Sequence, residues 1–378
     1  MADLDCIVLG TGGVGSAALY HLSRRGARAL GIDRFAPGHD RGSSHGETRI
    51  IRLAYFEHSD YVPLLRRAYE LWGELEERRG QKLYHETGLL EVGPSEGTVV
   101  PGVLASARRH SLEVESLDPR EAERRFPGFR IPEGMAAVFE RRAGYLRVED
   151  CVRAHAEEAV RLGARLVTGE TVLRWRADGA GVAVETDRGT HRAARLIVAA
   201  GAWAGGLLAD LGVRLEVRRK TLLWYRTASA QHREESGGPG FFYETPTGLF
   251  YGFPEIGDGE IKVAEHSGGE SVADPLTVDR SLRPSDRLPV EEFLRRYLPG
   301  VRADDCVRHA ICLYTMSRDE HFVVDRHPDH PQVSFAAGLS GHGFKFTSVL
   351  GEVLAGLALN GRTELPIGFL SCDRPGVR

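Results

Sequence analysis

Several features are scarce in this chain of 378 residues, and each absence argues against a class of protein. No apolar run reaches the roughly 18–20 residues that a membrane-spanning helix needs, and the N-terminus carries no basic segment followed by a long apolar one. We therefore expect neither a membrane protein nor a signal peptide. The five cysteines form no Cys-x-x-Cys pair. A disulfide framework or a structural zinc site is not expected, and a cytoplasmic location fits.

Excess charge of one sign is also missing. Lys and Arg total 49 against 53 Asp and Glu, a net charge of −4, which argues against a nucleic-acid binder. Among the cations lysine is rare, since the sequence holds only Lys82, Lys220, Lys262 and Lys345. A compositional bias toward arginine accounts for the total but not for these four positions. The length predicts two domains.

The first 33 residues carry the clearest motif. A short apolar strand over residues 5–9 leads into the turn GTGGVG, a helix over 16–25 and a second strand over 29–32 that ends in Asp33. Gly10 suits the tight turn, Gly12 lets the backbone approach a pyrophosphate, and Gly15 lets the helix pack close to the strand. Asp33 can accept hydrogen bonds from ribose hydroxyls. The motif predicts dinucleotide binding without choosing between NAD and FAD.

Glycine turns between a strand and a helix recur near residues 200 and 340, and β-rich sequence separates them. Helical periodicity appears over 59–79, 149–162, 290–297 and 347–359. These patterns predict an α/β fold with a Rossmann-like nucleotide-binding domain built from discontinuous segments, and an inserted, β-rich α+β domain. We place the first domain at residues 1–82, 144–214 and 307–378, and the second at 83–143 and 215–306.

Two pairs of basic side chains could carry chemistry. Arg49 and Arg52 are three residues apart, so on a helical turn they share one face and could grip a carboxylate; two solvated surface arginines are the alternative. Lys345 stands where a helix begins, a place unfavourable to a cation unless an anion compensates it or the side chain reaches solvent. Lys262 shares a strand face with His266, which either is solvated or lines a polar pocket.

Two further patterns point less clearly to chemistry. Cys312 lies in an apolar strand over 310–315, where most cysteines are inert core residues. His327 and His330 have metal-like spacing, but no second ligand pair supports them, and we expect no metal site.

Five motifs occur in order along nearly the whole chain: GTGGVG with Asp33, SSHGETRIIRLAY, GLFYGFP, ICLYTMSRDEHFVVD and AAGLSGHGFKFTS. With them the sequence resembles the monomeric sarcosine oxidase family, which includes N-methyl-amino-acid oxidases among the D-amino-acid-oxidase-like flavoproteins. The resemblance implies FAD rather than NAD, attached covalently through Cys312. It also implies that Arg52 and Lys345 hold the substrate carboxylate and that Lys262 promotes oxygen reduction near flavin N5.

The resemblance implies further roles. His45 and Arg49 would lie against the isoalloxazine ring, and Tyr251, His266 and Tyr314 would line the substrate side. Phe242 departs from the methionine of the sarcosine enzymes and would reshape the pocket, so it too is expected to contact substrate. The expected catalytic residues are Lys262, Arg49, His45, His266 and Tyr251. The expected cofactor-binding residues are Gly10, Gly12, Gly13, Val14, Gly15, Asp33, Arg34, Ser43, Ser44, Arg49, Val172, Gly201, Trp203, Cys312, Gly341, Gly343, Phe344 and Lys345.

The activity implied is oxidative demethylation of sarcosine or a similar N-methyl amino acid by a monomer. Hydride transfer to flavin would give an imine that hydrolyses to an amino acid and formaldehyde, while O2 is reduced to H2O2. The alternatives are a flavin oxidase or dehydrogenase of a bulkier secondary or cyclic amino acid (N-methyltryptophan, pipecolate, proline), and a nucleotide-binding protein without turnover or an NAD-dependent enzyme. The partners expected are the amino acid and O2, with neither nucleic acid nor membrane.

Overall fold

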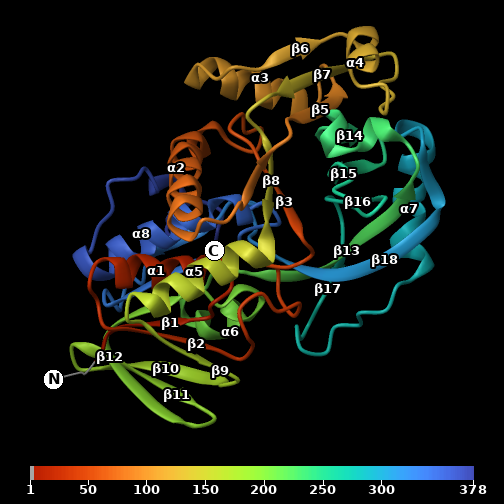
Figure 1. Ribbon diagram of the computed structural model, residues 1–378. Coiled ribbons are helices and arrows are strands. Elements are labelled where there is room, and N and C mark those ends of the chain that lie inside the picture. The colour runs from red at the N-terminus through yellow and green to blue at the C-terminus, as the bar shows by residue number, and fades with distance from the viewer. Residues whose placement is uncertain (1–3) are drawn as a thin grey trace.

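The computed structural model describes residues 4–378. The strands on either side of the glycine-rich turn belong to an eight-stranded sheet (Figure 1). Its parallel strands run in the order β20, β12, β1, β2, β9, and the other strands pair antiparallel at its edges. The strands are β1 (Leu4–Leu9), β2 (Ala29–Asp33), β9 (Arg165–Thr168), β10 (Val172–Asp178), β11 (Gly181–Thr186), β12 (Gly189–Val198), β19 (Val323–Arg326) and β20 (Val333–Ala337).

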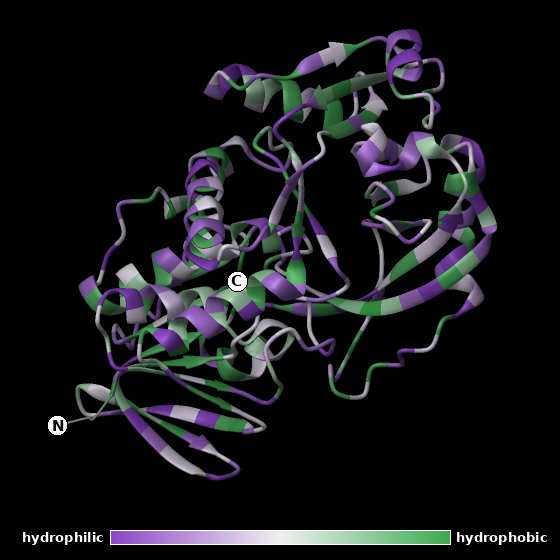
Figure 2. Ribbon diagram, in the orientation of Figure 1, coloured by the Kyte–Doolittle hydropathy of each residue, from purple (hydrophilic) through white to green (hydrophobic). Residues whose placement is uncertain are grey.

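Three helices pack together beside this sheet: α1 (Gly13–Arg24), α5 (Val148–Arg161) and α8 (Thr347–Asn360). The helix α8 is buried on nearly all sides, which its apolar sequence allows. It approaches α1 closely because Gly351 has no side chain, and a Cβ there would lie 2.5 Å from the backbone of Ala17. In Figure 2 the inner strand β1 is mainly green, whereas the outer strands β10 and β11 carry much purple and white.

The second large sheet has nine strands, and the long strands β13 and β18 run beside each other along it (Figure 1). Its core is aromatic: the rings of Phe250 and Phe293 stack 4.6 Å apart, and Tyr243 and Tyr297 pack against Phe293. The strands are β5 (Leu89–Pro94), β6 (Glu115–Leu117), β7 (Met135–Glu140), β13 (Glu216–Thr227), β14 (Gly240–Thr245), β15 (Gly248–Gly252), β16 (Glu260–Glu265), β17 (Glu270–Ser271) and β18 (Val301–Met316).

Helices α3 (Val99–His110), α4 (Pro119–Arg125) and α7 (Pro284–Tyr297) cover this second sheet. A third, three-stranded sheet of β3 (Thr48–Ile51), β8 (Gly144–Arg147) and β4 (Tyr84–Glu86) lies in the region between the two large sheets (Figure 1). The helical turn considered for Arg49 and Arg52 is wrong, because the backbone before Arg52 is the extended strand β3.

The remaining elements are short, apart from α2 (Val62–Arg79). This helix ends where Gly80 adopts the left-handed backbone conformation at φ 61°. The short elements are η1 (Ser59–Tyr61), η2 (Gly201–Trp203), α6 (Ala204–Leu207), η3 (Ala209–Leu211), η4 (Ala230–His232), η5 (Glu234–Ser236), η6 (Phe344–Phe346) and η7 (Gly368–Leu370). Within residues 4–378, no helix combines the length and the apolar character that a membrane crossing requires.

The architecture confirms the predicted α/β class, with parallel strands, flanking helices and a separate β-rich sheet. The strands and helices of the first sheet come from three stretches of the chain that are far apart in sequence. The domain boundaries given above stay a prediction.

Candidate active site and cofactor cavity

A cavity of about 400 Å³ opens at the carboxyl ends of the parallel strands. Leu9, Asp33, Ala199 and Ala337, which end or follow β1, β2, β12 and β20, all line it. Ligands of open α/β sheets bind at this edge, where loops diverge and helix N-termini point at the ligand. The sheet thus places a large binding cavity beside the glycine-rich turn.

The glycine turn has the geometry that close approach requires. Gly10 has φ +82°, and a Cβ on Gly15 would lie 1.7 Å from the carbonyl oxygen of Gly10, so helix and turn could not pack with any side chain there. At Gly12 a Cβ would meet nothing nearer than Ser44 Oγ at 3.7 Å. Gly15 therefore serves packing, whereas Gly12 leaves space on the side of the cavity.

Asp33 holds the turn together from the end of β2. Its Oδ2 accepts hydrogen bonds from the Thr11 backbone N–H at 2.6 Å and the Thr11 hydroxyl at 3.2 Å, and its Oδ1 accepts one from the Phe35 N–H. The carboxylate is nearly buried and lines the cavity.

Most residues predicted to bind cofactor do line this cavity. Gly15, which packs behind the turn, and Lys345, which lines a second cavity, are the ones that do not. The predicted residues around the large cavity are Gly10, Gly12, Gly13, Val14, Asp33, Arg34, Ser43, Ser44, Arg49, Val172, Gly201, Trp203, Cys312, Gly341, Gly343 and Phe344.

Unsatisfied polar groups show that the cavity suits a polar ligand. Trp203 Nε1, Thr315 Oγ1 and Thr347 Oγ1 are buried without a hydrogen-bond partner, and all three residues line it. Buried polar groups normally have partners, so these atoms call for a ligand with several donors and acceptors. A glycine cradle, a strand-end carboxylate and unpaired donors together fit a flavin dinucleotide.

A smaller cavity of about 40 Å³ adjoins the large one, since Arg49, Tyr314, Gly341 and Phe344 line both. The residues predicted to bind substrate converge here from four different elements or loops. Its lining comprises Arg49, Ile50, Arg52, Glu57, Phe242, Tyr251, His266, Tyr314, Gly341, His342, Phe344 and Lys345.

Arg52 is the most enclosed cation of the small cavity, with 2% of its surface exposed. Its guanidinium donates to Glu57 Oε2 at 2.6 Å, lies 3.4 Å from Glu91 Oε1, and packs over the rings of Phe56 and Phe242. The expectation of solvated surface arginines is therefore wrong. Burial would raise the pKa of Glu57, but Arg52 lowers it to about 2, whereas burial raises the pKa of Glu91 to about 8.

Lys345 is buried as well, so its side chain does not reach solvent. Its Nζ donates to the His342 carbonyl at 2.9 Å and to the Tyr55 hydroxyl at 3.4 Å. Burial, together with nearby Arg52, lowers the pKa of Lys345 to about 7. Arg52 and Lys345 repel each other, and the ionised Glu57 stabilises both of them.

Cys312 and Arg49 meet on the boundary of the two cavities. Arg49 donates through one guanidinium nitrogen to Cys312 Sγ at 3.3 Å and to the Ser43 carbonyl at 2.9 Å. The sulfur is buried in β18 and lines the large cavity. A cation against the sulfur is an environment typical of reactive cysteines rather than of inert core residues.

Lys262 and His45 line neither cavity, and both are buried. Lys262 Nζ donates to the carbonyls of Gly46 at 2.5 Å and Thr48 at 2.8 Å, so the solvated strand face considered for it is wrong. Burial and then Arg49 lower the pKa of Lys262 well below its usual value. The same two causes lower the pKa of His45 to about 3, and its Nε2 has no hydrogen-bond partner.

His266 and Tyr314 form one wall, with His266 Nδ1 and the Tyr314 hydroxyl 3.4 Å apart. Phe242 stacks with Tyr251 at 6.5 Å and meets His266 edge-on at 5.8 Å. Burial and then Lys220 lower the pKa of His266 to about 3, so this wall is neutral near pH 7.

The sequence analysis gave no role to Glu57, Glu91, His342 or Lys220, which all lie near the site. Glu57 follows Arg52 by five residues, and His342 lies inside the motif AAGLSGHGFKFTS. Their closeness in sequence to predicted site residues is the signal that could have indicated both. Lys220 stood out only as one of four lysines, and no motif gave it a role. Its buried Nζ donates to the Ser267 carbonyl at 2.5 Å and lies 5.6 Å from the Tyr314 ring, a position that only the pairing of β13 with β18 creates.

Comparisons with known proteins agree with this geometry. The family model described as FAD dependent oxidoreductase matches residues 5–357. The chain is 41% identical to "Monomeric sarcosine oxidase" of Bacillus sp. (strain B-0618), covering 99% of this chain and 97% of the relative. It is 39% identical to "N-methyl-L-tryptophan oxidase" of Yersinia pestis (strain Pestoides F), covering 98% and 99%.

Solved structures give the same result. The open form of NikD, described as an unusual amino acid oxidase essential for nikkomycin biosynthesis, superposes with a TM-score of 0.86 at 28% identity and covers 98% of both chains. L-proline dehydrogenase from P. horikoshii shares the fold with a TM-score of 0.81 at 21% identity, covering 98% of this chain and of that one. A family match over most of the chain, relatives near 40% identity and a cavity suited to a flavin dinucleotide lead to one conclusion: this chain belongs to the FAD-dependent oxidoreductases.

Proposed function

We propose that this enzyme oxidises a small N-methyl amino acid, with sarcosine as the preferred substrate, to the demethylated amino acid, formaldehyde and H2O2. The observation that carries the proposal is the small cavity, in which two buried cations, Arg52 and Lys345, stand at one site beside aromatic walls. FAD, when bound, accepts a hydride from the substrate and returns the electrons to O2.

The charges of the small cavity match an amino acid that binds through its carboxylate. Arg52 and Lys345 supply donors for two carboxylate oxygens, and Arg49 adds a third positive charge on the boundary. The ionised Glu57 offsets one of these three charges, so the lining stays positive. These cations also favour the uncharged form of the substrate amine, which is the form that can give up a hydride. His266, kept neutral by burial and Lys220, adds no further positive charge beside the amine.

The size of the cavity favours a small substrate. The small cavity has about a tenth of the volume of the large one, 40 against 400 Å³, which favours a small amino acid such as sarcosine over one with an indole side chain. Phe242 lines the cavity and occupies space between Arg52 and Tyr251. This argument separates sarcosine from the bulkier substrate named for the Yersinia relative.

A substrate panel tests this proposal. Sarcosine, N-methylalanine, N-methyltryptophan, pipecolate and proline are compared by peroxide release and by flavin bleaching without oxygen. We expect the highest kcat/KM with sarcosine, and peroxide in amounts equal to the substrate consumed. Bleaching without peroxide would indicate a dehydrogenase, and a preference for N-methyltryptophan would overturn the size argument.

We further propose that FAD is linked covalently through Cys312. Support comes from the position of its sulfur in the large cavity and from the hydrogen bond that Arg49 donates to it. After acid precipitation the yellow colour should stay with the polypeptide, and in Cys312→Ser it should pass into the supernatant. Cys306→Ser, a change outside both cavities, is the matched control and should retain the colour.

Lys262 is proposed to assist oxygen reduction. Its buried Nζ donates to the carbonyls of Gly46 and Thr48 in the segment that begins β3. These two acceptors favour the charged ammonium, against burial and Arg49, which lower its pKa. A fixed cation of this kind stabilises the negative charge that develops on reduced oxygen. The same segment carries Arg49, so Lys262 also holds the backbone that positions this guanidinium.

A further inference from the structure

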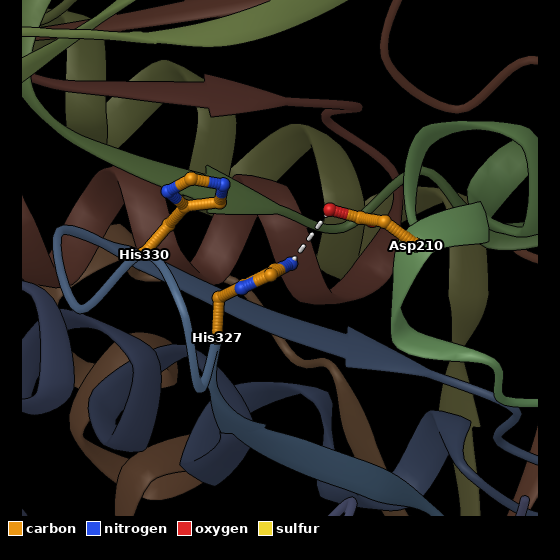
Figure 3. Close-up of side chains that lie close together, drawn as sticks. All are labelled: Asp210, His327 and His330. Atoms are coloured by element: carbon orange, nitrogen blue, oxygen red, sulfur yellow. Dashed lines mark hydrogen bonds and ion pairs between the residues drawn. The ribbon is translucent and has the colours of Figure 1, made fainter.

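A cluster of ligand-type side chains lies outside both cavities, where the connection from β19 to β20 meets the segment η3. His327 and His330 are three residues apart in sequence, with no further ligand pair to support them. The fold places Asp210 beside them (Figure 3). One ligand atom from each residue lies within 4.8 Å of the others. In the part of the chain from residue 4 to 378, no other group of three or more such side chains meets this criterion.

The separation of two of these ligands already suits a metal ion. His327 Nε2 and Asp210 Oδ2 are 3.0 Å apart. A tetrahedral ion with bonds of about 2.0 Å holds its ligand atoms about 3.3 Å apart. The His330 ring stands 4.8 Å from the His327 ring (Figure 3), and an ion held by all three side chains requires the His330 side chain to rotate toward the other two.

The frame of the cluster is fixed, while its mouth is open. His327 is 2% exposed. Its backbone N–H donates to the Val333 carbonyl at 2.9 Å, and the Val333 N–H donates to the His330 carbonyl at 2.8 Å, so two hydrogen bonds close the connection. Trp175 packs edge-on against both imidazoles and donates its indole N–H to the Leu207 carbonyl at 2.7 Å. His330 is half-buried and Asp210 is exposed, so an ion can enter from solvent.

We propose that Asp210, His327 and His330 bind one divalent first-row transition ion, for which Zn²⁺ is the probe. Two imidazole nitrogens and one carboxylate oxygen are the donor set of borderline ions such as Zn²⁺, Co²⁺ and Ni²⁺, whereas Ca²⁺ and Mg²⁺ prefer oxygen ligands alone. Three protein ligands leave a position for water.

The tautomer of His327 affects how tightly an ion can bind. His327 Nδ1 accepts a hydrogen bond from the Asp329 N–H at 3.2 Å, so its Nε2 carries the proton that is donated to Asp210. An ion on Nε2 requires this proton to move to Nδ1, and the hydrogen bond from Asp329 is then lost. Binding is therefore expected to be about 10- to 100-fold weaker than at a site whose tautomer is already set for metal.

The ion would also brace the cofactor cavity. Asp210 lies in η3 just after α6, and Trp203 and Leu207 of this stretch line the large cavity. An ion held by Asp210 and by the two histidines before β20 would link two parts of the cavity lining. One is the stretch that carries Trp203 and Leu207, and the other is the end of strand β20. Zn²⁺ should accordingly raise the melting temperature, since an ion that binds only the folded state stabilises it.

The test uses the flavin-loaded, full-length chain without an affinity tag, freed of metal by a chelator. Calorimetric titration with ZnCl2 should show one saturable site per chain, while CaCl2 and MgCl2 show none. Asp210→Asn and His330→Gln change side chains that are not deeply buried, and each should weaken Zn²⁺ binding at least about tenfold. Both variants should also lose the increase in melting temperature that Zn²⁺ gives the parent enzyme.

The matched control is His191→Gln. His191 Nε2 lies 2.6 Å from Glu170 Oε1, a histidine–carboxylate pair of the same kind that belongs to no three-ligand group. This variant should bind Zn²⁺ as the parent does. The proposal is overturned if the parent shows no saturable Zn²⁺ binding, or if the affinity survives either Asp210→Asn or His330→Gln.

Discussion

Replacing Arg52 with lysine tests the carboxylate site most directly. The substitution keeps one positive charge beside Glu57 and Glu91, so no buried carboxylate is left without a cation. It removes the planar fork, with which arginine can hold both oxygens of a carboxylate. The expected loss is therefore in substrate binding, with the fold intact.

The magnitude follows from the contacts that Arg52 makes. Its guanidinium is 2% exposed and already donates at 2.6 Å to Glu57, so the bonds it offers a carboxylate form in a site shielded from water. One hydrogen bond to a charged group contributes about 1.5–3 kcal/mol. Losing one of two such bonds corresponds to about a 10- to 150-fold fall in kcat/KM, with most of it in KM.

The assay is steady-state peroxide release over a range of sarcosine concentrations, with melting temperatures measured in parallel. Arg67→Lys is the matched control, because Arg67 makes a two-pronged pair with Glu352 at 2.8 and 2.9 Å outside both cavities. It should leave KM unchanged. An unchanged KM in Arg52→Lys, or the same change in both variants, would refute the assignment.

Three further predictions address oxygen, pH and the glycine turn. In Lys262→Met, stopped-flow mixing should show flavin reoxidation by O2 slowed by at least about 100-fold and reduction by sarcosine little changed, as expected if a buried cation stabilises developing charge; equal slowing of both steps would argue against the oxygen role. The protonated fraction of Lys345 falls as pH rises through its pKa of about 7, and Glu91 gains a negative charge near its pKa of about 8, so both weaken binding of a carboxylate at high pH. Hence the inhibition constant of acetate, a carboxylate without a titrating amine, should rise above pH 7, and Glu91→Gln should remove only the upper part of the rise; a flat profile contradicts this. Gly15→Ala should abolish flavin retention and lower the melting temperature, because its Cβ would lie 1.7 Å from a carbonyl oxygen of the turn, and wild-type flavin content would contradict it.

Local pattern was sufficient for some of the regular elements, whereas it gave no prediction for α3 or α4. The turn that begins at Gly10, the helix that ends at Gly80 and the apolar helix α8 all follow from spacing, capping and turn chemistry among neighbouring residues. These interactions act over a few residues, so the sequence displays them directly. The order of five motifs also predicted the family, which the comparisons confirm.

Burial of charge was not visible in the sequence. Arg52, Lys262 and Lys345 read locally as side chains that could be solvated, and all three are buried because segments distant in sequence close over them. Helical spacing also gave the wrong geometry for Arg49 and Arg52, since pairing of β3 with β8 extends the backbone there.

The sequence by itself determined the glycine turn, the alternation of strands and helices and the membership of a flavoprotein family, because each depends on neighbouring residues or on ordered motifs. Only the tertiary structure placed Lys220 behind Tyr314, Glu91 against Arg52, and Asp210 beside His327 and His330. Strand pairing and side-chain packing create these contacts. The residues in each contact are far apart in sequence, so no local pattern of neighbouring residues indicates that they meet.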